Sequence, residues 1–187
     1  MSLSIDDIEK LFAAHGASQY SGEAVTQLQH ALQTAWLAAQ AGADDELVTA
    51  SLLHDLGHLL NDQGETPSLR GIDDTHQYFA LPFLRGLFSE RVLNPIKLHV
   101  DAKRYLCHVD PGYWAALSAD SKRSLTLQGG IYSAEACAAF MRQPGASDAV
   151  VLRQWDDRAK DASIQTPSLA HFLQRAGRCA LPPVSAR

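Results

Sequence analysis

The sequence predicts an all-α fold in a single domain, and three observations lead to that prediction. Apolar residues recur every three or four positions along most of the chain, which is the spacing of one helix face. No segment alternates apolar and polar residues as a half-buried strand would, and no internal repeat is present. The 187 residues, 46% of them hydrophobic, suffice for one domain with a sizeable core. We expect residues 1–187 to form it, with a frayed C-terminal tail from about residue 181.

Three helices are predicted in the first third of the chain. They cover residues 5–12, residues 23–41 and residues 46–60. Gly42 is a C-terminal signal for the second, and Asp44 or Asp45 can cap the third. The third should be interrupted or ended around Gly57. The polar stretch that follows, residues 61–74, holds several turn formers, which predicts a loop.

Helical spacing continues in the rest of the chain. The predicted segments are residues 75–88, residues 89–109, a short helix opened by Asp110 and Pro111, and helices near residues 133–142, 148–160 and 168–177. Pro95 should lie near a helix start or a kink, because proline lacks the amide that an interior position needs.

Charge and composition narrow the setting. A net charge of -5 provides no basic face for a phosphate backbone, so we expect no nucleic-acid partner. The three cysteines are an odd number without CxxC spacing, which indicates a reducing cytoplasm. The N-terminus carries acids where a signal peptide would be basic, and no apolar run approaches a membrane span. We therefore expect a cytoplasmic protein without membrane contact.

The histidines indicate a metal centre. A lone histidine on an apolar helix is usually a core residue, but His30, His54, His76 and His99 fall on four successive helical segments. Four helices of a bundle could each direct one imidazole at a common centre. Asp55, among leucines, would be costly as an unpaired carboxylate, and its two oxygens could bridge two cations. His58, one turn after His54, should share its face, either as a further ligand or as a residue that orients a ligand or faces the substrate.

Several motifs resemble the HD-domain superfamily, named for its His-Asp doublet. The resemblance rests on the ordered set "HALQTAWLAAQ", "LLHDLGH", two later histidines and "WDD". Within it, "YSGEAVTQLQH", "HVDAKRYL", "LQGG" and "RQWDD" are most similar to the mixed-valent di-iron oxygenases that cleave carbon–phosphorus bonds, from about residue 20 to residue 160.

That resemblance implies a helical bundle around two iron ions, mixed-valent Fe(II)/Fe(III), with O2 as cosubstrate. One iron would be held by His30, His54, Asp55 and Asp156. Asp55 would bridge to a second iron on His76 and His99. Asp156 matches the terminal aspartate better than Asp157, although a one-residue shift stays open.

The resemblance also implies an organophosphonate substrate. The expected phosphonate contacts are Lys103, Arg153, Ser121 and Gln128, with His58 as a substrate-side base and with Tyr20 and Glu23 closing over the iron. Asp73 and Asp74 could pair with a trimethylammonium group or, equally, cap the helix that begins at Thr75. We favour 1-hydroxy-2-(trimethylammonio)ethylphosphonate, giving glycine betaine and phosphate, over 2-amino-1-hydroxyethylphosphonate, giving glycine and phosphate.

Two other functions stay open at this point. One is a metal-dependent phosphohydrolase of the same superfamily, which would turn over without oxygen. The other is a catalytically silent helical binding module that keeps the His-Asp set for structure. Tyr20 and Glu23 favour the oxygenase, since a hydrolase has no evident need for them. The oligomeric state is left open.

Overall fold

The computed structural model describes residues 2–20, 22–61 and 67–182, and these residues confirm the all-α class. Within them no strand forms, and one isolated antiparallel bridge joins Gln19 to Thr26. No helix in this part of the chain is long and apolar enough to cross a membrane.

The helices follow one another along the chain, with one 3-10 turn, η1, among them. In order they are α1 (Ile5–His15), α2 (Gln27–Gln40), α3 (Asp45–Leu53), α4 (Leu56–Leu60), η1 (Pro67–Arg70), α5 (His76–Phe79), α6 (Leu81–Leu84), α7 (Glu90–Val109), α8 (Tyr113–Ala116), α9 (Ala119–Leu127), α10 (Ala134–Met141), α11 (Ala146–Arg158) and α12 (Leu169–Cys179).

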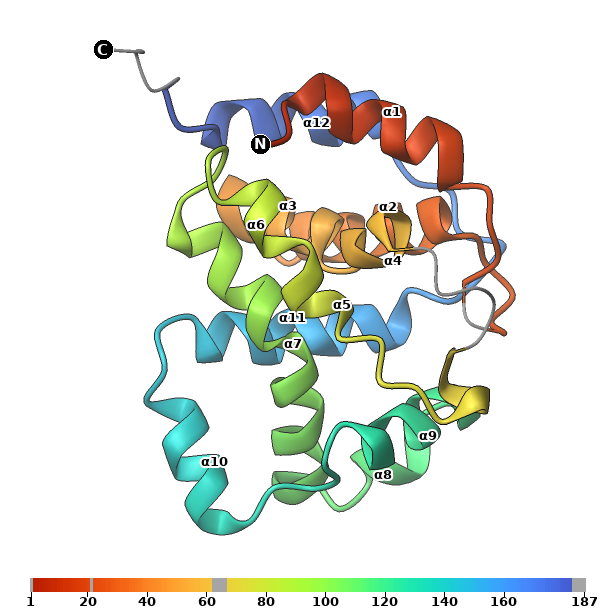
Figure 1. Ribbon diagram of the computed structural model, residues 1–187, viewed down its shortest axis with the longest axis vertical. Coiled ribbons are helices and arrows are strands. Elements are labelled where there is room, and N and C mark those ends of the chain that lie inside the picture. Colours follow the sequence, from red (N-terminus) through yellow and green to blue (C-terminus); the bar gives the residue numbers. More distant parts are fainter. Residues whose placement is uncertain (1, 21, 62–66, 183–187) are drawn as a thin grey trace.

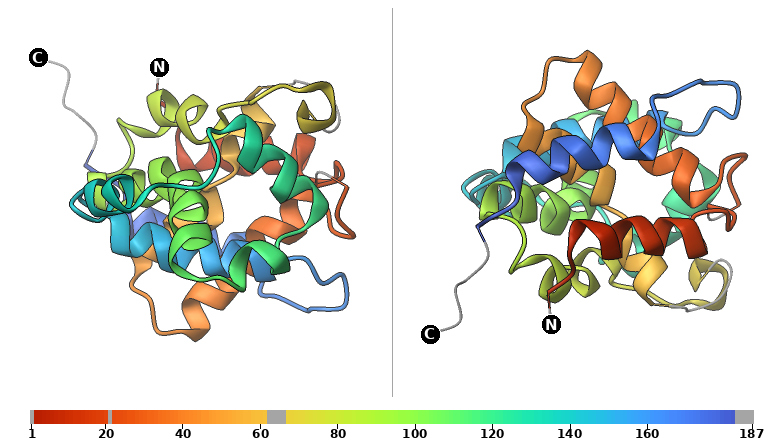
Figure 2. Two further views of the ribbon diagram at one scale, coloured as in Figure 1. Left: turned by 90° about the horizontal axis from the view of Figure 1, so that it is seen from below. Right: turned by 90° about the horizontal axis from the view of Figure 1, so that it is seen from above.

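The long helix α7 and the central helix α3 organise the packing. Helix α7 lies against both α11 and α3, while α2 and α12 pack on α3 (Figure 1). Helices α1 and α12 cover one end of the molecule, as the view from above in Figure 2 shows. At the other end α10 lies on one side of α7, and α8 and α9 lie on the other.

Local capping decides where several helices begin. Thr26 and Gln29 form a capping box, with the Thr26 hydroxyl accepting the Gln29 amide and the Gln29 side chain accepting the Thr26 amide. The predicted start of this helix at Glu23 is therefore wrong by four residues. Asp44 caps α3, as expected, by accepting the Leu47 amide at 2.9 Å.

The predicted helix over residues 46–60 breaks at the His-Asp doublet. Asp55 has φ -103° and ψ 12°, which ends α3 and starts α4 two residues earlier than the predicted break at Gly57. Gly57 has another use, because α4 meets α5 there. A Cβ atom on Gly57 would lie 2.1 Å from the carbonyl oxygen of His76, so this contact requires glycine.

The remaining boundaries differ in detail from the predictions. The predicted helix over residues 75–88 is divided into α5 and α6, and α8 begins at Tyr113 instead of at Asp110 and Pro111. Pro95 is accommodated inside α7. Neither η1 nor α9 was predicted, because short, polar segments give little apolar periodicity.

The two predicted irregular segments are described only in part. Of the predicted loop over residues 61–74, residues 62–66 lie outside the described residues, as do residues 183–187 of the predicted frayed tail. At the start of that tail, the Leu181 amide donates a hydrogen bond to the Leu87 carbonyl oxygen at 2.8 Å. The chain is therefore held at residue 181.

Apolar packing surrounds the doublet on the inside of the molecule. Leu52, Leu53 and Leu56 are almost fully buried in the largest core cluster. The core thus holds rigidly the elements that carry the histidines.

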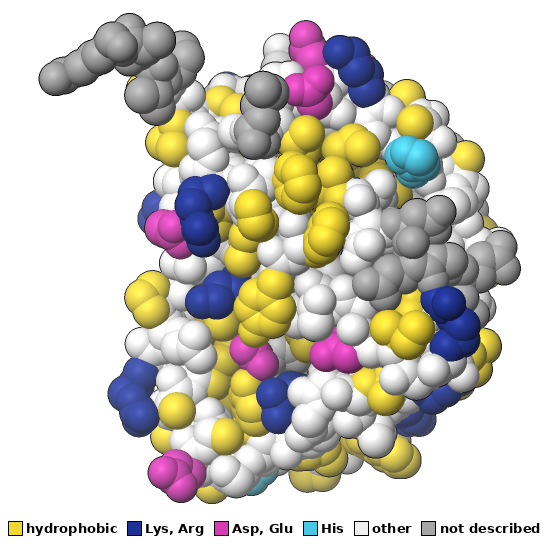
Figure 3. Space-filling model, in the orientation of Figure 1, with side chains coloured by type: hydrophobic (Ala, Val, Ile, Leu, Met, Phe, Trp, Pro, Cys, Tyr) yellow, Lys and Arg dark blue, Asp and Glu magenta, His cyan; other side chains and the backbone are white. Residues whose placement is uncertain are grey.

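On the outside of the molecule, hydrophobic side chains gather where α5 and α6 lie (Figure 3), and Tyr78 and Phe79 are partly exposed there.

Candidate metal centre and adjoining pocket

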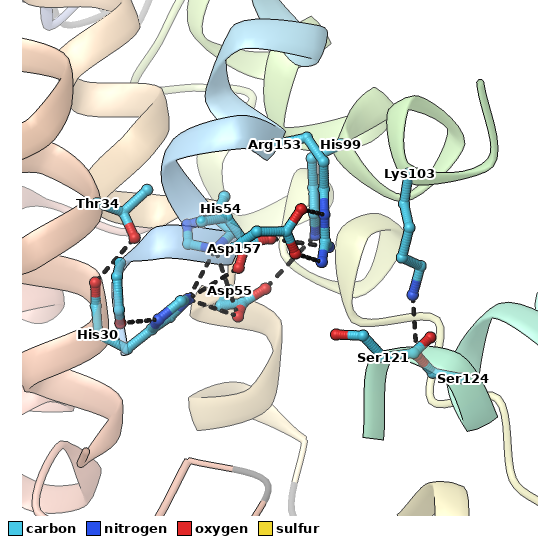
Figure 4. A network of polar contacts seen from close by, with 12 residues as sticks. His30, Thr34, His54, Asp55, His99, Lys103, Ser121, Ser124, Arg153 and Asp157 are labelled. Atoms are coloured by element: carbon cyan, nitrogen blue, oxygen red, sulfur yellow. Dashed lines mark hydrogen bonds and ion pairs between the residues drawn. The ribbon is translucent and has the colours of Figure 1, made fainter. Parts of the chain in front are cut away.

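Six side chains from six segments meet in the interior. They are His30 on α2, His54 at the end of α3, Asp55 between α3 and α4, His76 at the start of α5, His99 on α7 and Asp156 on α11. All six are buried. Figure 4 shows His30, His54 and Asp55 close together, with His99 beside them.

Three of these residues form a first group of ligand atoms. The Nε2 atoms of His30 and His54 are 3.2 Å apart, and Asp156 Oδ1 lies 3.3 Å from His30 Nε2. Asp55 Oδ2 joins this group, at 3.6 Å from His30 Nε2 and 3.4 Å from His54 Nε2. Two imidazoles and two carboxylates therefore surround one point.

A second group lies on the other side of Asp55. The Nε2 atoms of His76 and His99 are 3.0 Å apart. Asp55 Oδ1 lies 3.2 Å from His76 Nε2 and 3.5 Å from His99 Nε2. Each Asp55 oxygen thus faces a different histidine pair, which is the arrangement of a carboxylate that bridges two cations.

Hydrogen bonds fix the imidazoles in one tautomer. The Nδ1 atoms of His30, His54 and His99 donate to backbone carbonyl oxygens of Ala159, Ser51 and Ile96, at 2.8, 2.9 and 2.7 Å. With the ring proton on Nδ1, the Nε2 lone pairs point into the centre. Metal-binding histidines are oriented in this way in proteins.

The carboxylates at this centre fit a cation. Asp55 Oδ2 and both oxygens of Asp156 are buried and accept no hydrogen bond, and a buried acceptor without a partner is costly. Burial raises the pKa of Asp55, but His54 and His76 outweigh it and hold the pKa well below its usual range. Burial lowers the pKa of His99 to about 4, so this imidazole is neutral. Burial also lowers the pKa of His76, but Asp74 and Asp55 outweigh it and raise that pKa to about 10, so a cation would replace a proton there. Carboxylates and imidazoles are a donor set for first-row transition metals.

Asp74 supports the second group from behind. Its Oδ1 accepts a hydrogen bond from His76 Nδ1 at 2.7 Å, and its Oδ2 lies 3.2 Å from His58 Nδ1. Asp74 Oδ1 also accepts the His76 amide at 3.3 Å, as the helix-cap alternative for this loop requires. Both Asp73 and Asp74 line the cavity described next, but Asp74 is engaged with protein groups.

The helix is interrupted at Asp55, between His54 and His58, so the four-residue spacing of one continuous helix does not apply to this pair. The His58 ring stacks on that of His76, with centroids 4.1 Å apart, and its Nε2 lies 3.9 Å from Asp55 Oδ1. His58 lies beside the second group and also lines the cavity.

A cavity opens from the second group of ligands. Its lining includes all seven residues predicted for substrate contact, together with the predicted gating residue Tyr20. The seven are His58, Asp73, Asp74, Lys103, Ser121, Gln128 and Arg153. The structure thus brings these residues to one side of the candidate metal centre.

Helices α7 and α9 supply the donors of this cavity. Lys103, one turn after His99 on α7, is buried, and its Nζ donates to Ser124 Oγ at 2.8 Å (Figure 4). Burial, helped by the charge of Arg153, lowers the pKa of Lys103 to about 7. Ser124 was missed because α9 was not predicted, although its spacing of three residues from Ser121 was a usable signal. Gln128 Oε1 is buried without a hydrogen-bond partner.

Helix α11 separates the two neighbouring aspartates. Asp156 turns toward His30 and His54, while Asp157 turns toward Arg153. Arg153 Nη1 also lies 2.8 Å from Asp156 Oδ2, so the guanidinium and the two histidines share this carboxylate. The geometry supports Asp156 as the ligand position.

The structure places Tyr20 and Glu23 differently. The Tyr20 ring stacks on His30, with centroids 3.8 Å apart and planes 12° apart, and lines the cavity. Glu23 is paired with Lys160 at 3.0 Å and is absent from the described cavity lining. The two residues are nevertheless in contact, because the Glu23 amide donates to the Tyr20 carbonyl oxygen at 2.7 Å, and their closure over the metal stays a prediction.

The chain is similar to known proteins over most of its length. The HD domain family matches residues 28–132. The chain is 41% identical over 176 residues to hydroxymethylphosphonate dioxygenase of Gimesia maris, covering 94% of this chain and 87% of the relative. It is 36% identical over 178 residues to the glycine-betaine-forming [1-hydroxy-2-(trimethylamino)ethyl]phosphonate dioxygenase of Leisingera caerulea, covering 93% and 89%. It is also 33% identical over 171 residues to the uncharacterized protein L432 of Acanthamoeba polyphaga mimivirus, covering 90% and 78%.

Proposed function

Because the chain belongs to the HD-domain family and is similar to phosphonate dioxygenases over most of its length, we propose that it cleaves the carbon–phosphorus bond of a small 1-hydroxylated phosphonate. The protein is an oxygen-dependent oxidoreductase with a metal centre. The observation that carries the proposal is Asp55, whose two oxygens face two separate histidine pairs. A site for two metals beside a cavity with cationic donors suits oxidation of an anion.

The metals of this proposal are two iron ions in a mixed-valent Fe(II)/Fe(III) state. One would be held by His30, His54 and Asp156, the other by His76 and His99, with Asp55 shared. Bound iron would supply the redox chemistry that couples O2 to the substrate carbon. The second group offers three protein ligand atoms, which leaves room for substrate oxygens at that metal.

The chain's own task is to hold and orient the phosphonate. Lys103 and Arg153 supply positive charge, while Ser121, Ser124 and Gln128 supply hydroxyl and amide groups. Lys103 lies on the same helix as His99, one turn later, so the anion and the second metal would be neighbours. Charge-assisted hydrogen bonds of this kind are the strong contacts for phosphonate oxygens.

Hydroxymethylphosphonate is the substrate that the cavity favours. A quaternary ammonium group is recognised by aromatic faces, and Tyr20, stacked on His30, is the one phenol or phenyl ring among the described lining residues. Asp74, one of the two acids expected to face a substrate cation, is engaged by His76 and His58. With one O2, hydroxymethylphosphonate would give formate and phosphate, which accounts for every atom of both reactants.

A substrate with a cationic end is the second candidate, and Asp73 favours it. This carboxylate lines the cavity, and its described hydrogen bond is a long one, at 3.4 Å from the Thr75 amide. It could pair with the trimethylammonium group of the substrate favoured by the sequence, or with a primary amine.

A product assay separates these substrates. The iron-loaded protein is given each of the three hydroxyphosphonates in air, and phosphate is measured. We expect the highest kcat/KM with hydroxymethylphosphonate, and no effect of Asp73→Asn on that substrate. A higher kcat/KM for a cationic substrate, lost in Asp73→Asn, would establish the second candidate. Equal phosphate release under nitrogen would instead indicate a phosphohydrolase.

A further inference from the structure

Tyr113 and Asp157 enclose Arg153 on the side away from the metal ligands. Arg153 Nη2 and Nε both donate to the Asp157 carboxylate, the latter at 3.2 Å. Nε also donates to the Tyr113 hydroxyl at 3.2 Å, and that hydroxyl donates to Asp157 Oδ2. Burial raises the pKa of Tyr113, so the phenol keeps the proton that it donates. The three side chains form a closed ring of hydrogen bonds.

This ring determines which N–H groups of Arg153 remain for a ligand. A guanidinium has five N–H donors in a rigid plane. Asp157 and Tyr113 take the N–H of Nε and one N–H of Nη2, while Nη1 forms an ion pair with Asp156 at 2.8 Å. The edge formed by Nη1 and the second N–H of Nη2 is left for a ligand, and Arg153 lines the cavity. Because Asp157 is bound in a bidentate manner, the plane of the guanidinium cannot rotate freely.

The fold holds this pair rigidly. Tyr113 is the first residue of α8 and packs against Cys107, Leu117 and Leu125, the last of which lies on α9 between Ser124 and Gln128. Asp157 lies one turn after Arg153 on α11. The same apolar cluster therefore fixes the Tyr113 ring and the helix that carries the hydroxyl donors of the cavity.

We propose that Tyr113 and Asp157 are positioning residues that aim the free edge of Arg153 at the phosphonate of the substrate. The proposal rests on the proposed function, in which Arg153 binds that anion. It gives Asp157 a role of its own beside the adjacent Asp156. It also gives a role to a tyrosine that the motifs in the sequence did not single out.

The direction in which the affinity for an anion changes on mutation of Asp157 distinguishes a positioning role from a simple effect of its charge. Asp157→Asn removes a negative charge close to the cavity, which by Coulomb's law alone would strengthen anion binding. If Asp157 orients Arg153, the same change weakens binding, because the bidentate contact is lost. Tyr113→Phe changes no charge and removes only the hydroxyl.

The test is calorimetric binding of methylphosphonate, an anion without a hydroxyl, to iron-loaded protein under nitrogen. Loss of a hydrogen bond to a charged group corresponds to a loss of affinity of about tenfold or more, and we expect this for Asp157→Asn and a smaller loss for Tyr113→Phe. Asp148→Asn, exposed on the same helix, and Tyr78→Phe, partly exposed, are matched controls expected to bind like the wild type. Iron content should be unchanged in all variants.

A double-mutant cycle with Arg153→Lys completes the test. If Tyr113 acts through Arg153, Tyr113→Phe has no further effect in the lysine background. Unchanged or tighter binding in Asp157→Asn, or an equal effect of Tyr113→Phe in both backgrounds, would overturn the proposal. Turnover of hydroxymethylphosphonate by the wild type tests the proposed function separately, so binding that follows the expected pattern without turnover would refute the function alone. A wild-type protein that binds no methylphosphonate would overturn both.

Discussion

Replacing Asp55 by asparagine should remove both metals at once. The side chain keeps its shape, but it loses the charge that faces four imidazole nitrogens at 3.2 to 3.6 Å. Asp156→Asn is the comparison, because the imidazoles that Asp156 faces are those of His30 and His54, in the first group alone. We expect the first variant to lose the stabilisation from two ions and the second that from one.

The expected size of this effect follows from binding linkage. An ion present at 100 times its Kd stabilises the folded state by about 2.7 kcal/mol, so two ions contribute roughly 5 kcal/mol. For a domain of this length, 1 kcal/mol corresponds to about 2–4 °C in Tm. Ferrous iron should therefore raise the Tm of the wild type by roughly 10–20 °C, that of Asp156→Asn by about half as much, and that of Asp55→Asn very little.

The assay is anaerobic thermal unfolding followed by circular dichroism, with ferrous iron or with a chelator. The chelated samples compare the folds alone, and iron analysis after desalting gives the stoichiometry. An iron-dependent rise in Tm for Asp55→Asn as large as that of the wild type would refute the bridging role of Asp55. An equal loss of the iron-dependent rise in Tm in the two variants would also refute this role.

Three other predictions concern the surroundings of the site. Gly57→Ala should lower the free energy of unfolding by at least about 2 kcal/mol in urea titrations, because its Cβ would overlap the His76 carbonyl; unchanged stability would contradict this close contact. Burial lowers the pKa of Lys103 to about 7, so its ammonium form is lost as the pH rises above that value. The KM for the phosphonate should therefore rise with pH in the wild type, and Lys103→Arg should flatten this rise. A wild-type KM that does not change with pH would count against the prediction. The hydrogen bond from Arg178 lowers the pKa of Asp45, so its stabilisation is present above the ordinary carboxyl pKa and is lost as the pH falls below about 4; in Tm measurements Asp45→Asn should show a shallower acid slope than the wild type.

The sequence predicted the features that depend on local spacing. Helices with a clear apolar face, such as α1 and α7, were located within one to three residues at each end. The convergence of His30, His54, His76 and His99 was also predictable, since one imidazole on each of four helical segments is typical of a metal site inside a bundle. The family resemblance supplied Asp156 and Lys103, which spacing alone would not have identified.

Contacts between distant segments could not be read in this way. Asp74 lies in a loop whose path decides whether it faces a substrate or His76, and Glu23 meets Lys160 from the other end of the chain. Ser124 stayed hidden because α9 has a weak apolar pattern and depends on its cap at Ser118 and its packing. These features depend on tertiary contacts, which residue spacing does not encode.

The coupling of oxygen consumption to phosphate release tests the central claim most directly. Iron-loaded protein is supplied with hydroxymethylphosphonate, and dissolved O2, phosphate and formate are measured together. We predict one O2 consumed for each phosphate and each formate formed, and no phosphate under strict anaerobiosis. Phosphate release that continues at the same rate without oxygen would contradict the account.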